Sequence, residues 1–310
     1  MINIERIGHD QLFKQLLQAF FADFMRLFDP ETAAQLDLST ISFRDAEAFT
    51  DIPQGERRTA DLVAEIRTLA GLKELILAHV EIQREREARF PRRMWQYYSV
   101  LRQREDLPVI PIAVVLYPGR VGIAREVYEE TVLGQTILTF SYLQISLPLL
   151  DSTEYVGAES VLGAGLASVM RLPARREAQI ALHLASLRRV REALDTGQVD
   201  DARAFLLVNF IATYLPLNDA EREELRVQLE QEGDSTMETT ELTWAERMFE
   251  QGEQRGMRAA IRQLLRARFG SVSPEAEATL AGLTREEDLT AFIGRAAVAR
   301  SEAELLTPAP

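Results

Sequence analysis

The stretch "TADLVAEIRTLAGLKELILAHVEIQ", residues 59–83, decides the fold because it predicts the central hairpin of a sheet. Residues 59–68 and 73–83 are both rich in apolar, strand-forming side chains, and "LAGL" between them predicts a turn. A connection this short favours antiparallel pairing of the two strands. With the turn centred near residues 70–71, the numbers of two paired residues add up to about 141–142. This register decides which side chains of the two strands share a face.

The second strand carries two polar residues in an otherwise apolar segment. Glu81 and Gln83 are two positions apart, so they share one face of the strand. The predicted register places Asp61 opposite Glu81 or its neighbour, from where Asp61 can reach the same face. Two carboxylates and an amide oxygen that converge in this way suit Mg²⁺, which prefers hard oxygen ligands. The alternative is an exposed polar strand end that binds nothing.

A predicted helix over residues 8–28 precedes the sheet, with an apolar stripe at helical spacing that ends before Pro30. Asp10 in this helix can complete the metal site directly or through a water molecule. Lys14 lies one turn further on the same helix face, from where it can steady the phosphate or the acid. In the alternative interpretation, Asp10 only complements the helix dipole and Lys14 is a solvated base.

The N-terminal part as a whole predicts an α/β core over residues 1–150. Its elements follow in the order helix, three strands, helix, strand, strand, and residues 120–134 give no clear signal. Glu65 has the same strand parity as Asp61, and we expect it to be a structural ion-pair partner. The elements that complete the core are a short strand at 41–49, a helix at 89–105, a buried strand at 107–119 and a strand at 136–150.

The strand signal ends after residue 151, and the remaining chain predicts helices only. We expect a helical extension over 151–235 and a C-terminal helical domain over 236–310, with the polar stretch "EGDSTMETTE" as a linker between them. Gly270 is positioned to cap the end of a long helix in the C-terminal domain. The expected fold is therefore an α/β core followed by an all-α C-terminal half.

Composition narrows the classes of function. The net charge of −13 argues against a general nucleic-acid coat protein. The absence of cysteine excludes disulfides, thiolate zinc sites and a cysteine nucleophile, and it fits a reducing compartment. The first ten residues lack the basic and apolar segments of a secretory signal, and no apolar run approaches the ~18 residues that span a bilayer. We therefore expect a cytoplasmic protein with no membrane partner.

Arginine supplies nearly all of the positive charge, because Lys14 and Lys73 are the only lysines. A phosphate contact in this protein is therefore expected to come from guanidinium groups. Arg92 and Arg93 in the predicted helix at 89–105 can contact a DNA backbone, together with nearby aromatic rings. Alternatively, these arginines pair with acids while the aromatic rings pack the helix on the sheet, which is the interpretation that we favour for Trp95 and Tyr98.

A second basic stripe lies near the C-terminus, where residues 254–268 contain five arginines and no acid. Four arginines at helical spacing form the stripe: Arg255, Arg258, Arg262 and Arg266. The stripe can bind phosphates, which would make the affinity depend on salt. It can equally bind the acidic surface of a second subunit, which the net charge of −13 favours slightly.

Several stretches in order along residues 5–150 resemble the Rpn family of recombination-promoting nucleases, which are also described as transposases. They are "HDQLFKQLL", "RRTADLVAEI", "LAHVEIQRERE", "FPRRMWQYY" and "PVIPIAVVLYPG". The pattern is similar to the PD-(D/E)XK nuclease core, with Gln83 in place of the usual lysine. A further segment, 246–306, looks like a domain of unknown function that is often appended to such nucleases and implies no activity of its own.

The resemblance implies a restriction-endonuclease-like fold and a DNA endonuclease that depends on Mg²⁺ or Mn²⁺ and acts in recombination. Asp61 and Glu81 would be metal ligands, and Asp10 would be the acid from the helix. Nucleases of this fold commonly form homodimers, so we expect one here. The runner-up hypothesis is an inactive nuclease-like scaffold that binds DNA or protein. The acidic balance and the missing lysine favour the scaffold, because Gln83 supplies only a dipole and leaves the charge role to Lys14 or an arginine.

Overall fold

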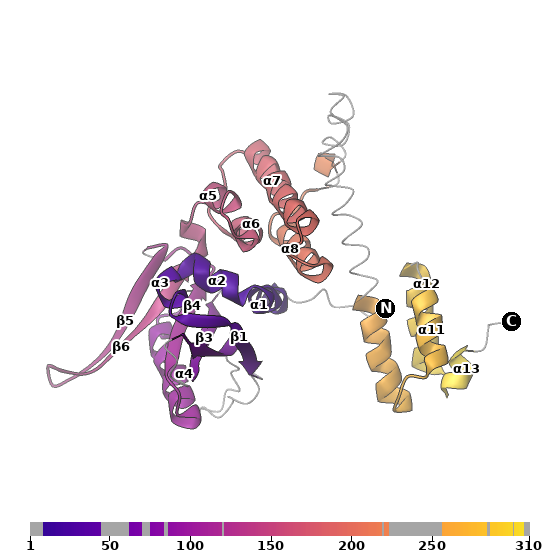
Figure 1. The fold of residues 1–310 in the computed structure, drawn as a ribbon, viewed down its shortest axis with the longest axis horizontal. Coiled ribbons are helices and arrows are strands. Elements are labelled where there is room, and N and C mark those ends of the chain that lie inside the picture. Colours follow the sequence, from indigo (N-terminus) through magenta and orange to yellow (C-terminus); the bar gives the residue numbers. More distant parts are fainter. Residues whose placement is uncertain are drawn as a thin grey trace. The chain divides into compact units, whose positions relative to one another are not determined.

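The computed structural model describes the chain in two compact units, Met1–Glu241 and Leu242–Pro310 (Figure 1). Within these units only the backbone is described at some positions, which include His9, Asp10 and the strand at 75–83. The described residues are 9–44, 62–69, 75–83, 86–119, 121–218, 220–222, 256–283, 286–299 and 301–306.

A six-stranded mixed sheet forms the centre of the first unit, in the order β1-β2-β3-β4-β6-β5. The first three strands pair antiparallel, β3 pairs parallel with β4, β4 pairs parallel with β6, and β5 and β6 form an antiparallel hairpin. The mixed α/β class is therefore as expected. The strands are β1 (Leu36–Arg44), β2 (Leu62–Thr68), β3 (Leu75–Gln83), β4 (Val109–Val115), β5 (Ile123–Val132) and β6 (Gln135–Ser146).

The hairpin of β2 and β3 confirms the predicted register. Leu62 pairs with Val80 and Arg67 pairs with Leu75, so the numbers of each pair add up to 142. The short connection left these strands no other arrangement than antiparallel neighbours. Asp61, which precedes β2, lies outside the described residues.

Helix α4 (Phe90–Glu105) covers one face of the sheet. It connects β3 to β4, because parallel strands require a crossover that is long enough to return the chain to the same end. Pro91 lies in its first turn, where a missing N–H costs nothing, and Asp106 ends it in the left-handed conformation with φ of 52°. Phe90 and Met94 on this helix pack in one buried cluster with side chains of β4 and β6.

The opposite face is covered by the first helices of the chain. They are α1 (His9–Ala19), α2 (Phe21–Phe28) and α3 (Pro30–Ala33). The Phe21 ring contacts the Phe43 ring of β1 edge-on, with the ring centres 5.7 Å apart. The expected single helix over 8–28 is thus two helices, separated at Phe20, whose backbone has φ of −121° and ψ of 28°. No glycine or proline lies at this break, and the apolar periodicity continues across it. The sequence therefore did not predict two helices.

The helices that follow the sheet belong to the same unit as the sheet. Phe13 of α1 contacts Phe210 of α8, with ring centres 5.2 Å apart. The expected extension from residue 151 is therefore packed on the N-terminal helices, and the boundary between the two compact units falls after Glu241. The helices of this part are α5 (Ser152–Val156), α6 (Val161–Leu166), α7 (Arg176–Asp195) and α8 (Asp201–Tyr214).

Strand β5 occupies the region that gave no clear signal in the sequence. Charged residues alternate along it with apolar ones because it is the last strand of the sheet and much of its surface is exposed. Leu133 and Gly134 connect it to β6 with φ of 51° and 78°, as a type I′ turn requires. The hairpin extends beyond the other strands of the sheet (Figure 1).

The second unit is helical in its described part, as predicted. Residues 256–269 form one helix, and Gly270 caps it with φ of 83° and a 2.9 Å bond from its N–H to the Arg266 carbonyl. The core contains Ile261, Leu265 and Phe292, all fully buried. Three further helices close around it: α11 (Pro274–Gly282), α12 (Glu286–Val298) and α13 (Glu302–Leu306).

The contact between α5 and α6 makes a prediction about Gly163. A Cβ atom on Gly163 would lie closer to the backbone oxygen of Tyr155 than van der Waals contact allows, and backbone cannot rotate away. We expect Gly163→Ala to lower the free energy of unfolding by about 1–3 kcal/mol, measured by urea denaturation. Gly157→Ala is the matched control, because its nearest neighbour would be 3.7 Å away. Equal midpoints for the two variants would contradict this packing.

Candidate functional site at the carboxyl edge of the parallel strands

The carboxyl ends of β3, β4 and β6 meet at one edge of the sheet, because these three strands are parallel. Glu81 of β3 stands beside Ala113 of β4, which stands beside Gln144 of β6. Gln83 stands beside Val115 at the end of the same strands. This edge is where open α/β sheets hold their ligands, so the predicted polar residues of β3 occupy a plausible position for a site.

The predicted metal ligands are placed to different extents. Glu81 and Gln83 lie in β3 and Asp10 lies in the first turn of α1, each with only its backbone described. Asp61 lies outside the described residues. Among the side chains that the structure does describe, no three of His, Cys, Asp and Glu come together as a metal site. Binding of Mg²⁺ or Mn²⁺ by Asp61, Glu81 and Asp10 therefore stays a prediction, as does the role of the half-buried Lys14.

A hydrogen-bonded loop closes the edge next to β4. The Ser146 hydroxyl, fully buried at the end of β6, donates to the Tyr117 carbonyl and accepts from the Gly119 N–H, each at 2.9 Å. A Cβ atom on Gly119 would lie 3.2 Å from the Gln144 amide nitrogen. The loop after β4 is therefore held tightly against the end of β6.

Tyr117 follows β4, and Tyr142 lies in β6. Burial raises the pKa of Tyr117, the positive charges of Arg86 and Arg93 lower it, and Glu126 raises it. Burial also raises the pKa of Tyr142, helped by Glu126 and Tyr117. Both phenols are therefore neutral at physiological pH, where they can donate hydrogen bonds.

The arginines of α4 differ in their surroundings. Arg93 is only 13% exposed, lies 2.5 Å from the Glu87 carboxylate and is centred 5.1 Å from the Phe90 ring. Arg92, one position earlier, is exposed. The expected pairing with acids therefore holds for Arg93, whereas Arg92 stays available to solvent and to a polyanion.

Three structural roles that the sequence predicted are confirmed. Trp95 packs 6.2 Å from Tyr128, and Tyr98 packs 5.1 Å from Phe140, measured between ring centres. Glu65 accepts a 2.8 Å bond from Arg44 Nε, and Arg44 also pairs with Glu105 at the end of α4. These aromatic and ionic contacts fix α4 and β1 to the sheet.

A shallow pocket of about 320 Å³ lies between α4 and the sheet, away from the carboxyl edge. It contains no acid, base or nucleophile other than neutral hydroxyl groups, so it offers no catalytic chemistry. Its lining consists of Trp95, Tyr98, Val109, Pro111, Leu138, Thr139, Phe140 and Ser141.

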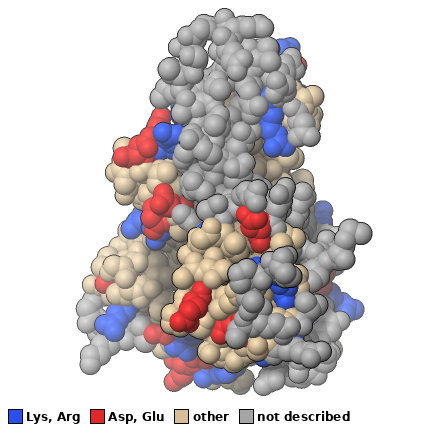
Figure 2. Space-filling view, turned by 90° about the vertical axis from the view of Figure 1, so that its right-hand side faces the viewer, with Lys and Arg blue, Asp and Glu red and all other residues tan. Residues whose placement is uncertain are grey.

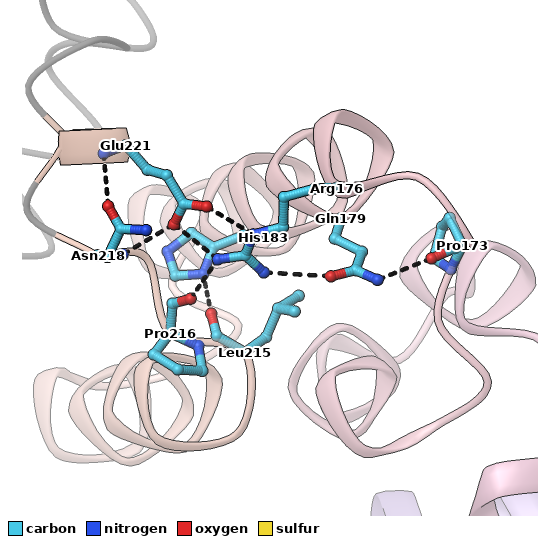
Figure 3. Close-up of polar contacts among 8 residues, drawn as sticks. All are labelled: Pro173, Arg176, Gln179, His183, Leu215, Pro216, Asn218 and Glu221. Carbon is cyan, nitrogen blue, oxygen red and sulfur yellow. Dashed lines mark hydrogen bonds and ion pairs between the residues drawn. The ribbon is translucent and has the colours of Figure 1, made fainter.

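A second polar cluster joins α7 to the chain after α8 (Figure 3). Arg176 binds both oxygens of Glu221 at 2.7 Å and donates to the Pro216 carbonyl at 2.8 Å. Asn218 and Glu221 cap each other, each side chain accepting from the other's backbone N–H at 2.8 Å. His183 is buried, and its Nδ1 donates to the Leu215 carbonyl at 2.8 Å.

This cluster is structural, because the bonds of Arg176 and His183 close the segment after α8 onto α7 and the Asn218–Glu221 bonds cap that segment. The bond from Arg176, together with the Asn218 N–H, lowers the pKa of Glu221 to about 2. Burial lowers the pKa of His183, and the charges of Arg176 and Arg222 lower it further against the effect of the Leu215 bond. Sequence periodicity predicted no partner for His183, because the Leu215 carbonyl lies 32 positions further along the chain.

The basic stripe of the second unit has partners inside that unit. Arg258 donates to the Leu283 carbonyl at 2.6 Å, and Arg262 binds Glu277 at 2.9 Å. Arg266 is exposed, and Arg255 lies outside the described residues. Two of the four arginines of the stripe, Arg258 and Arg262, thus hold α11 and the loop after it within the second unit.

The surface seen in Figure 2 has no broad basic patch among its described residues. Basic side chains lie apart from one another there, with acidic and uncharged residues between them. None of the described helices is long and apolar enough to span a bilayer. Comparisons of the chain with protein-family models, with curated proteins and with solved structures gave no match.

Burial of His183 predicts acid sensitivity. The pKa of His183 is lower in the folded than in the unfolded chain. Below about pH 6.5, His183 is therefore protonated in the unfolded chain while it remains neutral in the folded chain. The free energy of unfolding should therefore fall as the pH falls below 6.5, by up to about 1.4 kcal/mol per pH unit for this proton. Urea denaturation between pH 5 and 7 should show a shallower dependence in His183→Gln. The same slope in both proteins would exclude His183 as the cause.

Proposed function

We propose that this chain is a metal-dependent DNA endonuclease with a restriction-endonuclease-like core, related to the recombination-promoting nucleases that its sequence resembles. The observation that carries the proposal is the register of the central strands. Leu62 pairs with Val80 in the antiparallel hairpin, and Glu81 stands beside Ala113 in the parallel pair. The position of Glu81 is thereby at the carboxyl edge of the parallel strands, next to the start of β2.

The donor set of the proposed site fits Mg²⁺ or Mn²⁺, since it consists of carboxylates and an amide oxygen. Asp61 and Glu81 would hold the ion, with Asp10 completing the site directly or through water. A bound ion would lower the pKa of the attacking water and neutralise charge on the phosphodiester. Gln83 would orient that water through its amide, because it has no charge to offer.

We assign the missing positive charge to arginines at the same edge. Arg86 precedes α4 and Arg93 lies in its first turn, so both follow the carboxyl end of β3 closely along the chain, and their charges lower the pKa of Tyr117 after β4. Arg93 is held by Glu87 and by the Phe90 ring, so it would be pre-oriented toward a phosphate. The exposed Arg92 on the next position of α4 would contact the DNA backbone beyond the site.

The second candidate function is a nuclease-like scaffold that binds DNA or protein without cleaving it. The net charge of −13 and the glutamine at position 83 favour this alternative. It shares the fold with the first proposal and differs only in the chemistry at Glu81 and Asp61, so a cleavage assay separates the two.

Conversion of supercoiled plasmid in the presence of Mg²⁺ or Mn²⁺ tests the nuclease. We expect Asp61→Asn and Glu81→Gln to lower the cleavage rate by roughly 100-fold or more, because each removes a charged metal ligand. Asp106→Asn is the matched control, since Asp106 is exposed in a left-handed conformation that asparagine also adopts. Wild-type protein that binds the plasmid without cleaving it would support the scaffold and exclude the nuclease.

The proposed role of Arg86 predicts a separate effect. We expect Arg86→Gln to lower kcat/KM for plasmid cleavage about tenfold, which corresponds to about 1.4 kcal/mol. The exposed Arg86 side chain makes a folding defect unexpected. Arg102→Gln, near the opposite end of α4, removes the same charge and should leave the rate unchanged. Equal rates for Arg86→Gln and wild type would exclude Arg86 and leave the charge role to Arg93 or Lys14.

A further inference from the structure

Exposed apolar side chains gather on one hairpin of the molecule. In the described part of the chain, large hydrophobic residues with high exposure are Leu69 and six residues between positions 121 and 137. Those six are Val121 (54% exposed), Ile123 (37%), Val127 (52%), Val132 (51%), Leu133 (100%) and Ile137 (61%). Scattered single residues of this kind need no explanation, but their concentration on one element indicates a surface that another molecule covers.

Strand β5 is also at an edge of the sheet, and among the described strands it pairs with β6 alone. It is ten residues long and contains neither proline nor lysine, the residues with which proteins commonly block a free edge. The irregularity in its pairing with β6 falls near the tip, between Glu130 and Thr131. A ten-residue edge with exposed apolar side chains, whose pairing is regular from Ile123 to Glu130, is suited to pairing with another strand.

We propose that β5 pairs antiparallel with β5 of a second copy of this chain, across a twofold axis at Val127. The two six-stranded sheets would then form one continuous sheet. The strand "IAREVYEETV", residues 123–132, is complementary to itself in this register. Self-complementarity is what a twofold interface requires, since each patch must fit its own copy.

The register places matching side chains opposite one another on one face of the sheet. Val127 faces Val127 of the second copy at the axis. Arg125 faces Glu129 on each side of it, and Ile123 faces Thr131. Apolar pairs and pairs of opposite charge directly across an antiparallel ladder both stabilise it.

Neighbouring registers place like charges opposite one another. An axis at residue 125 sets Arg125 against itself, and an axis at residue 126 sets Glu126 against itself. An axis at residue 128 sets Glu126 against Glu130. Directly opposite side chains must share a face of the sheet. Registers that pair an odd-numbered residue with an even-numbered one are therefore excluded. Because like charges across a ladder are destabilising, the axis at Val127 is favoured over its neighbours.

Arg125 has enough donors for this role. Its side chain is 59% exposed, and its guanidinium lies 3.8 Å from the Asp29 carboxylate at the end of α2. Five N–H groups on one guanidinium can serve Asp29 and Glu129 of the second copy together. This charge complementarity within a single strand argues for a second copy as the occupant, rather than for an unrelated strand.

Disulfide trapping tests the axis directly, because the chain has no cysteine of its own. Residues opposite each other in an antiparallel pair have Cα atoms about 4.5–5.5 Å apart, within the range that a disulfide accepts. We expect Val127→Cys to form a covalent dimer under mild oxidation. Ile137→Cys, which lies on β6 and is at least as exposed as Val127, should remain largely monomeric on a non-reducing gel. Equal or faster trapping of Ile137→Cys would overturn the proposal.

Charge reversal tests the register in the full-length chain, with mass measured by light scattering across a dilution series. Arg125→Glu and Glu129→Arg should each weaken the dimer at least tenfold, and the double variant should regain most of the affinity. Circular dichroism melts establish that each variant is folded. A wild-type monomer at all concentrations, or single variants that dimerise like wild type, would overturn the proposal. None of these readouts depends on cleavage, so failure here leaves the proposed nuclease unaffected.

Discussion

The position of β3 between an antiparallel and a parallel neighbour is the constraint on which the rest of the first unit depends. Its short connection to β2 fixes one register, from Leu62 opposite Val80 onward. Its parallel pairing with β4 requires a crossover, and α4 provides this by passing over one face of the sheet. The other face must then be covered by α2 and its neighbouring helices, whose aromatic side chains bury it.

The same constraint places the chemistry. Because β3, β4 and β6 run in one direction, the positions of Glu81, Gln83 and Gln144 come to a common edge. The crossover begins directly after that edge, with Arg86 before α4 and Arg93 in its first turn, and the charges of both lower the pKa of Tyr117. A nuclease that has glutamine in place of lysine would obtain its phosphate-binding charge from the crossover helix instead of from the strand.

Much of the arginine in this acidic chain stabilises the fold. Arg44 joins β1 to Glu65 and Glu105, Arg176 closes the segment after α8, and Arg262 holds α11. Each guanidinium offers several donors in one plane and so can connect two elements at once. The net charge of −13 therefore coexists with local basic groups, and other arginines, such as Arg92, remain exposed.

The sequence by itself determined the central hairpin and its register, the crossover helix, the helical second unit and the cap at Gly270, because each depends on local periodicity or on a single turn. Tertiary structure decided the break at Phe20, the strand β5 and the buried partners of His183. Those features depend on contacts between distant residues, which periodicity does not record. An edge strand in particular carries mixed charged and apolar residues, and only its place at the end of the sheet shows that one of its sides is free.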